Sequence, residues 1–423
     1  MGVTMRKNLR LTILVMSLFS ILLFLLIIGP EANSAIVAAD NQADSGKPEV
    51  VDSGKEPTGP AIEQENEGEK GLSDVTCEIT EPEVAFQLRY DKYPLTYLYL
   101  LVQNDAVHIR KGPSAAEPVL RTAKKNEKLN YIETVTKDGI WYHVSWQEND
   151  RSFYGFVSAD AVTKRFFSFD KMHESVLKAE REFGKGPLTY IGNYHNLKGW
   201  APRYQGGELD KSGGRRSQSA PGYPDPSNLD EFSYLGDGTL VRVLNNGEKY
   251  TRVSLVKDGR VYFVPSQYVV TPAAVTAVKK AVVIDRANQN EVVFEKIGPE
   301  WKVVSYTLAT TGTTGKYHQP TPLGYYYAIE KRERFYYYKD GTTSIQGYAP
   351  YSIRFAGGAY IHGVPVNFKF TPEGVRVDPG KVEYSKTIGT VPLSHKCVRN
   401  YTSHAKFLYD WYTPGEMIVI VME

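Results

Sequence analysis

The stretch Ser394–Asn400 gathers residue types that carry out nucleophilic chemistry. It contains Cys397, one of only two cysteines in the 423-residue chain, with His395 two positions before it and Arg399 two positions after it. A second histidine follows an apolar run upstream, in the pair His362–Gly363. A cysteine, a histidine at the end of a strand and a tight polar turn are the parts that nucleophilic acyl transfer needs.

A cysteine nucleophile needs a base. The reference pKa of a thiol is about 8.5, so at neutral pH Cys397 needs a proton acceptor within hydrogen-bond reach. His362 is the first candidate, because Gly363 after it allows a sharp backbone turn that lets the imidazole face a cleft. His395 is the second candidate, although its place two residues before the cysteine favours a role in ordering the turn. His404, in a predicted helix, carries no such pattern.

Acyl transfer also needs hydrogen-bond donors for the negative charge that develops on the carbonyl oxygen. The backbone N–H groups of Lys396 and Cys397, in a turn just before a predicted helix, could supply them. Arg399 has two interpretations of equal weight. Its guanidinium binds a substrate carboxylate through two parallel hydrogen bonds, or it braces the loop through a buried ion pair.

The elements that must position these residues are mainly β-strands. The chain has 30 tyrosines, and they gather in strand-like segments such as 324–327, which favours a β-rich protein. A last helix is predicted from the apolar face of Ala405, Leu408 and Tyr412. The predicted C-terminal strands are 281–284 and 291–294, read as a hairpin, then 301–307, 325–330, 336–339, 359–362 and 416–422.

The N-terminus predicts export. Three basic residues precede an apolar run over 11–28, so residues 1–35 are either a secretory signal peptide or a membrane anchor. Residues 36–85 are rich in charged and small residues and predict a disordered linker. We expect an extracytoplasmic protein, at the cell wall or the outer face of the cytoplasmic membrane, that meets the membrane only through its N-terminal segment. A net charge of +2, without a basic run interleaved with aromatics, gives no nucleic-acid footprint.

Short strands separated by Gly and Pro turns fill residues 95–165. The stretch VHIRKGPSAAEPVL, followed by GIWYHVSW and GFVSADAV, resembles the bacterial SH3-like domain of exported cell-wall enzymes, a small β-barrel that binds wall or peptide. Residues 170–271 then predict a connector helix over 170–183, an irregular loop over 195–232 and strands over 238–270. These strands read as a degenerate second SH3-like unit or as a β-extension of the C-terminal domain.

Three features of the C-terminal region form one pattern. They are the Ile361–Gly363 element, the Ser394-His395-x-Cys397-x-Arg399 signature, and the segment from Thr311–Gly312 to Thr321–Gly324. With them, residues 275–423 resemble the L,D-transpeptidase family of the YkuD type. The resemblance implies a mostly β sandwich with one or two short helices, in which Cys397 is the nucleophile at the base of a cleft and His362 is the general base. The expected supporting or oxyanion residues are Ser394, His395, Lys396, Arg399 and Gly363.

Two features depart from the family pattern. The family usually has glycine where this chain has Lys396, and a lysine fits there only with an ordinary φ. Its ammonium either lowers the pKa of Cys397 or points away from it. The interval from His362 to Cys397 is also longer than usual and includes the turn signal 377–381, which predicts an inserted hairpin at the edge of the cleft.

The resemblance implies an exported cysteine L,D-transpeptidase that acts on the stem peptides of peptidoglycan. Cys397 would take the acyl group of a tetrapeptide stem with release of D-alanine, and an amine of a neighbouring stem would accept it in a 3→3 cross-link. Water as the acceptor would make the enzyme an L,D-carboxypeptidase. No metal or organic cofactor is expected, since no clustered ligand spacing suggests one.

Two other classes of protein fit less well. A papain-like wall peptidase has its cysteine before its histidine, whereas here His362 precedes Cys397. A non-catalytic wall-binding protein with a decayed catalytic domain is suggested by Lys396, but the rest of the signature is present. A disulfide between Cys77 and Cys397 would occupy the nucleophile, and we expect both thiols to be free.

Overall fold

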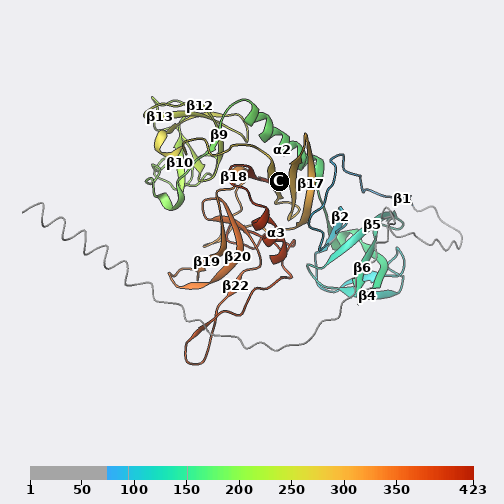
Figure 1. Cartoon of the computed structure of the whole chain (residues 1–423). Helices are drawn as coiled ribbons and strands as arrows, with labels where there is room; N and C mark the ends of the chain where they lie inside the picture. Colours follow the sequence, from blue (N-terminus) through green and yellow to red (C-terminus); the bar gives the residue numbers. More distant parts are fainter. Residues whose placement is uncertain (1–73, 94, 150) are drawn as a thin grey trace, which may run out of the picture. The chain divides into compact units, whose positions relative to one another are not determined.

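The computed structural model describes residues 74–93, 95–149 and 151–423. The apolar run and most of the predicted linker therefore lie outside the described residues. Residues 74–76, which the sequence assigns to that linker, instead form a strand because they pair in register with residues 134–136. Among the residues that the structure describes, none of the helices could span a membrane. The mainly β fold predicted from the sequence is confirmed (Figure 1).

The first sheet has eight strands in the order β4-β3-β7-β6-β5-β2-β8, with β1 paired to β5. Its core is formed by alternate strand residues such as Leu100, Leu129, Val144 and Val157, as expected where one face of each strand is buried. The strands are β1 (Asp74–Thr76), β2 (Leu98–Val102), β3 (Val107–Arg110), β4 (Val119–Ala123), β5 (Lys128–Thr136), β6 (Ile140–Glu148), β7 (Arg151–Ser158) and β8 (Val162–Phe166), with the 3₁₀ turn η1 (Ala159–Ala161) before β8.

Helix α2 (Phe169–Gly184) follows, and it confirms the helix predicted over 170–183. After it comes a set of strands that we call the middle module, residues 187–270. It contains a four-stranded sheet in the order β14-β13-β12-β9 and a separate pair, β10-β11. Its elements are β9 (Leu188–Tyr190), η2 (Tyr194–Asn196), β10 (Ser219–Gly222), β11 (Ser233–Gly236), β12 (Leu240–Asn245), β13 (Tyr250–Leu255), β14 (Val261–Pro265) and η3 (Ser266–Tyr268).

Strand β10 corrects the irregular loop predicted over 195–232. Its sequence, SAPG, has low strand propensity, so no local pattern indicates it. All four residues are nevertheless buried, and they pair antiparallel with β11. Tertiary burial therefore determines this strand.

The C-terminal domain, residues 275–423, contains two five-stranded sheets. One has the order β17-β16-β15-β26-β18, and the other has the order β19-β20-β21-β25 with β22 paired to β20. The first sheet comprises β15 (Lys280–Asp285), β16 (Asn290–Ile297), β17 (Glu300–Leu308), β18 (Gly324–Tyr327) and β26 (Met417–Met422). The second comprises β19 (Glu330–Tyr338), β20 (Ile345–Ala356), β21 (Ala359–His362), β22 (Val366–Asn367) and β25 (Val398–Arg399). The predicted β15–β16 hairpin is confirmed.

Strand β15 is buried on both faces, which explains its continuous apolar run. Val283 belongs to a core with Met172 and Val176 of α2, whereas Val282 packs in a core with Ile353 and Ile361 of the second sheet. The first sheet is therefore covered by α2 on one face and by the second sheet on the other, which is a sandwich in the sense expected.

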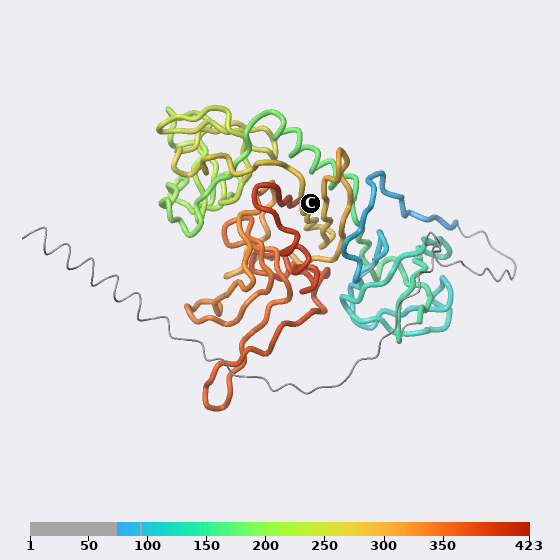
Figure 2. The backbone as a smooth tube through the Cα atoms, viewed as in Figure 1, coloured from blue at the N-terminus to red at the C-terminus, as the bar shows by residue number. Residues whose placement is uncertain are grey.

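Helix α3 (Thr402–Trp411) buries Ala405 and Leu408 as predicted, but it ends one residue before Tyr412. A hairpin is present in the long interval before Cys397, formed by β23 (Lys369–Phe370) and β24 (Arg376–Val377). Its turn lies at 371–375 rather than at the predicted 377–381. The hairpin is exposed and extends from the domain as an orange-red loop in Figure 2.

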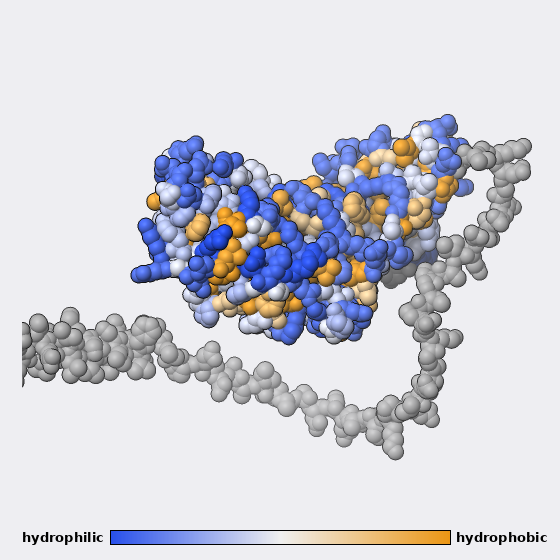
Figure 3. All heavy atoms as spheres, turned by 90° about the horizontal axis from the view of Figure 1, so that it is seen from above, coloured by the Kyte–Doolittle hydropathy of each residue, from blue (hydrophilic) through white to orange (hydrophobic). Residues whose placement is uncertain are grey.

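Exposed apolar side chains are distributed over the surface of the described residues. Examples are Trp200 in the middle module and Phe370 and Val375 in the β23–β24 hairpin. On the face shown in Figure 3, hydrophobic residues lie in separate patches among hydrophilic ones.

Candidate active site

Strands β21 and β25 bring the two main candidate residues together. They pair in parallel, with Ile361 opposite Val398 and His362 opposite Arg399. Ile361 and Val398 enter the core between the two sheets. Because strand side chains alternate, His362, Arg399 and the preceding Cys397 lie on the other face. The pairing therefore joins residues that are far apart in the sequence into one site.

Cys397 is a buried, free thiol, with only 9% of the residue exposed, and Cys77 is free as well. Burial raises the pKa of Cys397, while the backbone N–H of Tyr360 and the nearby charges of Arg399 and Lys396 oppose that rise. The thiol donates a weak hydrogen bond to the carbonyl oxygen of Gly358, with an Sγ–O distance of 3.7 Å. The resting group is therefore a protonated thiol that requires a base.

His362 lies on the same face as Cys397. Its Nδ1 lies 2.6 Å from the carbonyl oxygen of Gly363. Because a carbonyl can only accept, Nδ1 carries the proton and Nε2 keeps a free lone pair. Burial lowers the pKa of His362 to about 4, assisted by the charge of Arg399 and opposed by the Gly363 carbonyl. The imidazole is therefore neutral at physiological pH, and its Nε2 can accept a proton.

Gly363 serves a different purpose from the one predicted. Its φ is not in the left-handed region, so no sharp turn requires a glycine. A Cβ there would lie 2.8 Å from Oγ1 and 2.9 Å from Cα of Thr402, at the start of α3. Glycine is needed because the helix approaches the strand end closely.

The loop that carries the thiol is fixed by two hydroxyl groups. Ser394 donates through Oγ to the carbonyl oxygen of Cys397 at 2.5 Å. Thr321 donates to the carbonyl oxygen of Lys396 at 2.8 Å and accepts the N–H of Gly312 at 2.8 Å. Thr321 and Gly312 belong to the segment 311–324 of the family pattern, but no local signal in the sequence indicates that they hold this loop. The loop leads into the short strand β25, and α3 begins only at Thr402, so the predicted helix does not directly follow the turn.

His395 is directed to the surface. Its Nε2 lies 2.8 Å from Oδ1 of Asp340, and its ring stacks on His318 with 3.9 Å between ring centroids. The side chain is 48% exposed. Ligand atoms of His318, Asp340 and His395 lie within 4.8 Å of one another, and this nitrogen and oxygen set is one that a divalent transition metal accepts. The side chain of His395 is thus engaged at the surface, with Asp340 and His318.

Arg399 has no carboxylate partner among the described residues, so the predicted ion-pair brace is wrong. The loop is instead held by the backbone, since Arg399 and Thr310 exchange two hydrogen bonds of 2.9 and 3.0 Å. Its Nε is buried without a hydrogen-bond partner in the described part of the chain. Burial lowers the pKa of Arg399, and Cys397 and Tyr337 lie near enough to counter that effect. A guanidinium free to bind an anion therefore lies beside the thiol and the imidazole.

Lys396 adopts an ordinary φ, as its presence at a glycine position requires. Burial lowers the pKa of its ammonium, while the charges of Cys397 and Asp237 raise it. The ammonium lies beside Gly357, where an added Cβ would be 3.4 Å from Nζ and 3.6 Å from Oε1 of Gln218. Lys396 therefore contributes only a minor part to the pKa of the thiol and extends towards the middle module.

A second buried histidine lies outside this site. His404 of α3 shares a hydrogen bond of 2.9 Å with Oγ of Ser305, and its Nδ1 lies 3.3 Å from Glu291. Burial raises the pKa of Glu291 to about 8 and lowers that of His404 to about 3. Both groups are therefore neutral in the core at neutral pH.

Comparison with known proteins supports the assignment of two domains. Residues 279–421 match the family model of the L,D-transpeptidase catalytic domain, and residues 105–163 match that of the bacterial SH3 domain. The recognition made from the sequence is confirmed: an L,D-transpeptidase catalytic domain follows a bacterial SH3 domain in this chain. No curated protein matches the chain.

Several solved structures are similar to this chain at low identity. A fused Zn-dependent amidase/peptidase/peptidoglycan-binding domain-containing protein from Clostridium acetobutylicum is 19% identical over 34% of this chain, with a TM-score of 0.24, and the match spans about half, 52%, of that protein. An L,D-transpeptidase from Mycobacterium smegmatis is 15% identical over 70% of this chain and 99% of its own, with a TM-score of 0.26. L,D-transpeptidase 3 from Mycobacterium tuberculosis, in complex with a faropenem-derived adduct, is 16% identical over 46% and 71%, with a TM-score of 0.25.

Proposed function

We propose that this protein is an exported cysteine L,D-transpeptidase that cross-links peptidoglycan stem peptides. The observation that carries the proposal is the β21–β25 pairing, which sets the Cys397 thiol and a neutral His362 on one face of a sheet within the matched domain. A neutral imidazole next to a protonated thiol is the pair that nucleophilic acyl transfer uses.

In the first half-reaction, Cys397 attacks the carbonyl carbon of the bond between the third and fourth residues of a tetrapeptide stem. Nε2 of His362 takes the thiol proton as the carbon–sulfur bond forms, and the backbone N–H groups of Lys396 and Cys397 stabilise the oxyanion. The carbon–nitrogen bond then breaks, and the leaving D-alanine amine takes the proton from His362. A thioester remains on Cys397.

In the second half-reaction, an amine of a neighbouring stem attacks the thioester. His362 accepts a proton from that amine and returns it to the sulfur as the carbon–sulfur bond breaks, so the free thiol and a new amide are formed. Arg399, which has no carboxylate partner within the described residues, is free to orient a substrate carboxylate near the reacting bond. With water as the acceptor, the same steps give an L,D-carboxypeptidase.

The other parts of the chain fit this role. The SH3 domain would hold the enzyme on its polymer and raise the local concentration of stems. The apolar N-terminal run would take the protein across the cytoplasmic membrane, as a cleaved signal or as an anchor.

The test is to incubate the full chain with a disaccharide-tetrapeptide and follow the products by mass spectrometry, with Cys397→Ala as the control. Loss of one alanine together with a dimer mass, both absent in the control, supports transpeptidation. Loss of alanine without a dimer supports the carboxypeptidase alternative. No product, from a folded protein whose thiol also fails to react with a carbapenem, would leave a wall-binding protein.

A further inference from the structure

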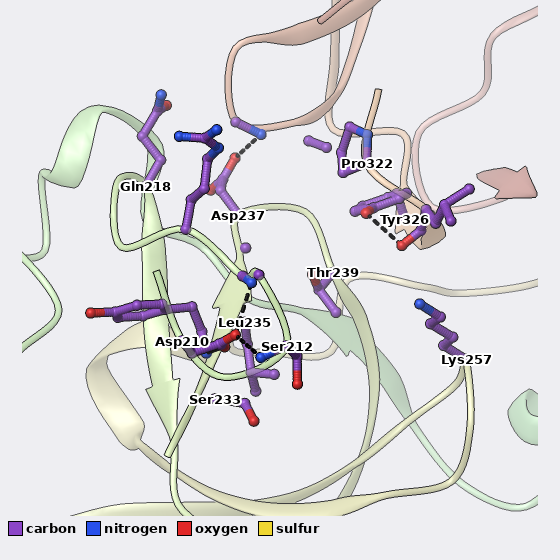
Figure 4. A pocket seen from close by; sticks show the side chains of 18 of the residues that line it. Asp210, Ser212, Gln218, Ser233, Leu235, Asp237, Thr239, Lys257, Pro322 and Tyr326 are labelled. Atoms are coloured by element: carbon purple, nitrogen blue, oxygen red, sulfur yellow. Dashed lines mark hydrogen bonds between the residues drawn. The ribbon is translucent and has the colours of Figure 1, made fainter. Parts of the chain in front are cut away.

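A cavity lies beside Lys396, between the middle module and the C-terminal domain (Figure 4). Its volume is about 480 Å³, within the range of sites that hold small ligands. The module contributes segments 210–218 and 233–239, and the C-terminal domain contributes 319–323, 356–357 and Lys396. The established family resemblance covers only one of these two walls, since the family match begins at residue 279.

The two walls are fixed to each other by buried contacts. Asp237 forms an ion pair of 2.6 Å with Arg354, and the two side chains are 1% and 8% exposed. Asp237 also accepts the N–H of Gly357 at 3.1 Å (Figure 4). Gly238 lies so close to the second sheet that a Cβ there would be 1.8 Å from the carbonyl oxygen of Phe355. The cavity is therefore a built site, with walls held by complementary charge and close packing.

The carboxylates of the cavity are already occupied. Asp210 accepts the backbone N–H groups of Ser212 and Gly214, both at 2.8 Å, and that of Tyr234 at 2.6 Å. Asp237 is engaged by Arg354. Both carboxylates keep their negative charge, but within the described residues neither forms an ion pair with Lys396, Arg215 or Lys257 at 4.0 Å or less.

Positive charge, in contrast, remains unpaired. Lys396, Arg215 and Lys257 all line the cavity, and none has a carboxylate partner within 4.0 Å in the part of the chain that the structure describes. Two further cations of the lining are paired, Arg260 with Asp258 at 2.8 Å and Arg286 with Glu423 at 3.5 Å. Three unpaired cations in a concave, partly enclosed site favour an anionic ligand.

The cavity is adjacent to the thiol. Lys396 precedes Cys397, and Gly357, in the cavity wall, precedes Gly358, whose carbonyl oxygen accepts the thiol hydrogen. Cys397 itself does not line the cavity, so an anion bound at Lys396 is one residue along the chain from the nucleophile. This position favours a carboxylate of the donor peptide over a phosphate of a separate wall polymer, which would have no reason to lie beside the reacting bond.

From these contacts we propose that the cavity is a specificity subsite for a carboxylate-bearing part of the acyl-donor peptide, with Lys396 and Arg215 as the residues that bind the carboxylate. The inference rests on the proposed function, and it deepens that function by naming the group of the donor that is recognised. Lys396, which stands where the family usually has glycine, then has a role in binding donor peptides. The middle module likewise becomes a part of the substrate site.

The test measures binding separately from turnover. The full chain with Cys397→Ala is titrated with a tetrapeptide donor and with donors in which one carboxylate at a time is amidated, using calorimetry. We expect one amidation to weaken binding about tenfold or more, and Lys396→Gln and Arg215→Gln to remove that difference by weakening only the free-carboxylate donor. Lys302→Gln is the matched control, because Lys302 pairs with Glu300 on β17 and does not line the cavity.

Each outcome decides the proposal. The proposal is overturned if all donors bind equally or if none binds. It is also overturned if both variants weaken the free and the amidated donors equally. Competition by inorganic phosphate at the same site, without any preference among donors, would overturn it as well. Turnover by the wild-type chain without carboxylate selectivity would refute the subsite and leave the proposed function standing. Selective binding without turnover would refute the proposed function and leave the subsite standing. Melting temperatures of the variants verify that they are folded.

Discussion

Removal of the Asp237 carboxylate should strongly destabilise the protein, because that carboxylate ties the middle module to the C-terminal domain. In the Asp237→Ala variant, Arg354 loses its 2.6 Å partner while staying only 8% exposed. The N–H groups of Asn193 and Gly357, which Asp237 accepts at 2.7 and 3.1 Å, also lose their acceptor. A buried cation and two buried donors would be left without their partner.

The magnitude follows from these three losses. Breaking a buried ion pair by removing one partner costs about 3–5 kcal/mol, and an unsatisfied buried donor adds about 1–3 kcal/mol. Arg354 keeps a second carboxylate, Glu330 at 2.8 Å, which reduces the first cost. We therefore expect Asp237→Ala to lower the free energy of unfolding by about 4 kcal/mol, a large share of the roughly 5–15 kcal/mol that domains possess.

Urea denaturation followed by circular dichroism measures this loss, with Glu231→Ala as the control. Glu231 pairs with Lys211 at 3.1 Å in the same module, but the two side chains are 47% and 63% exposed. An exposed pair is worth roughly 0–1 kcal/mol. The double variant Asp237→Ala, Arg354→Met removes the uncompensated charge, so it should lose about 2 kcal/mol less than the sum of the single variants. An Asp237→Ala variant within about 1 kcal/mol of the control would refute the reasoning.

Three further predictions follow from buried groups. Because the pKa of His362 is lowered to about 4, kcat/KM should keep its value from neutral pH down to about pH 5, and an acid limb centred near 6.5 in a pH–rate profile would contradict this. The pKa of Glu291 is raised from 4.5 to about 8, so the native state prefers the protonated carboxyl. The contribution of this preference to the free energy of unfolding is complete below about pH 4.5 and is lost as the pH rises to about 8. The side chain in Glu291→Gln stays neutral at every pH. The free energy of unfolding of this variant minus that of the wild type should therefore be roughly 2–5 kcal/mol larger at pH 8 than at pH 5. Equal differences at the two pH values would show that the carboxyl does not titrate in this range. Thr321→Val leaves the Lys396 carbonyl and the Gly312 N–H without their partner, so urea denaturation should show a loss of about 2 kcal/mol, and a neutral effect would mean that other groups hold the loop.

The elements that the sequence predicted are those with strong local patterns. Helix α2 has apolar residues at helical spacing and glycines at its end, and the β15–β16 hairpin has two apolar runs joined by a polar turn. Strand β10 has neither signal and exists because its four residues are buried against β11. The apolar pattern of the sequence extends α3 to Tyr412, whereas the last helical residue is Trp411. Tyr412 is buried, so it continues the apolar pattern beyond the end of the helix.

Some features of the candidate site could likewise be predicted from local sequence, and others depend on tertiary contacts. The residue types and the signature indicated Cys397 and His362, but their proximity depends on the parallel pairing of β21 with β25, a long-range contact that no local pattern encodes. Two further tertiary properties are that Arg399 has no carboxylate partner among the described residues and that Lys396 extends towards the middle module. The tie between Asp237 and Arg354 joins residues 117 positions apart, so it could not be predicted from one sequence.

Acyl transfer through Cys397 is tested by the intact mass of the full chain after brief incubation with a tetrapeptide donor. We predict an adduct equal to the donor minus D-alanine, located on the peptide that contains Cys397 and removed when an acceptor amine is added. The Cys397→Ala variant should form no adduct. If a folded wild-type protein with a free thiol formed no adduct, or formed one on another residue, Cys397 would not be the nucleophile.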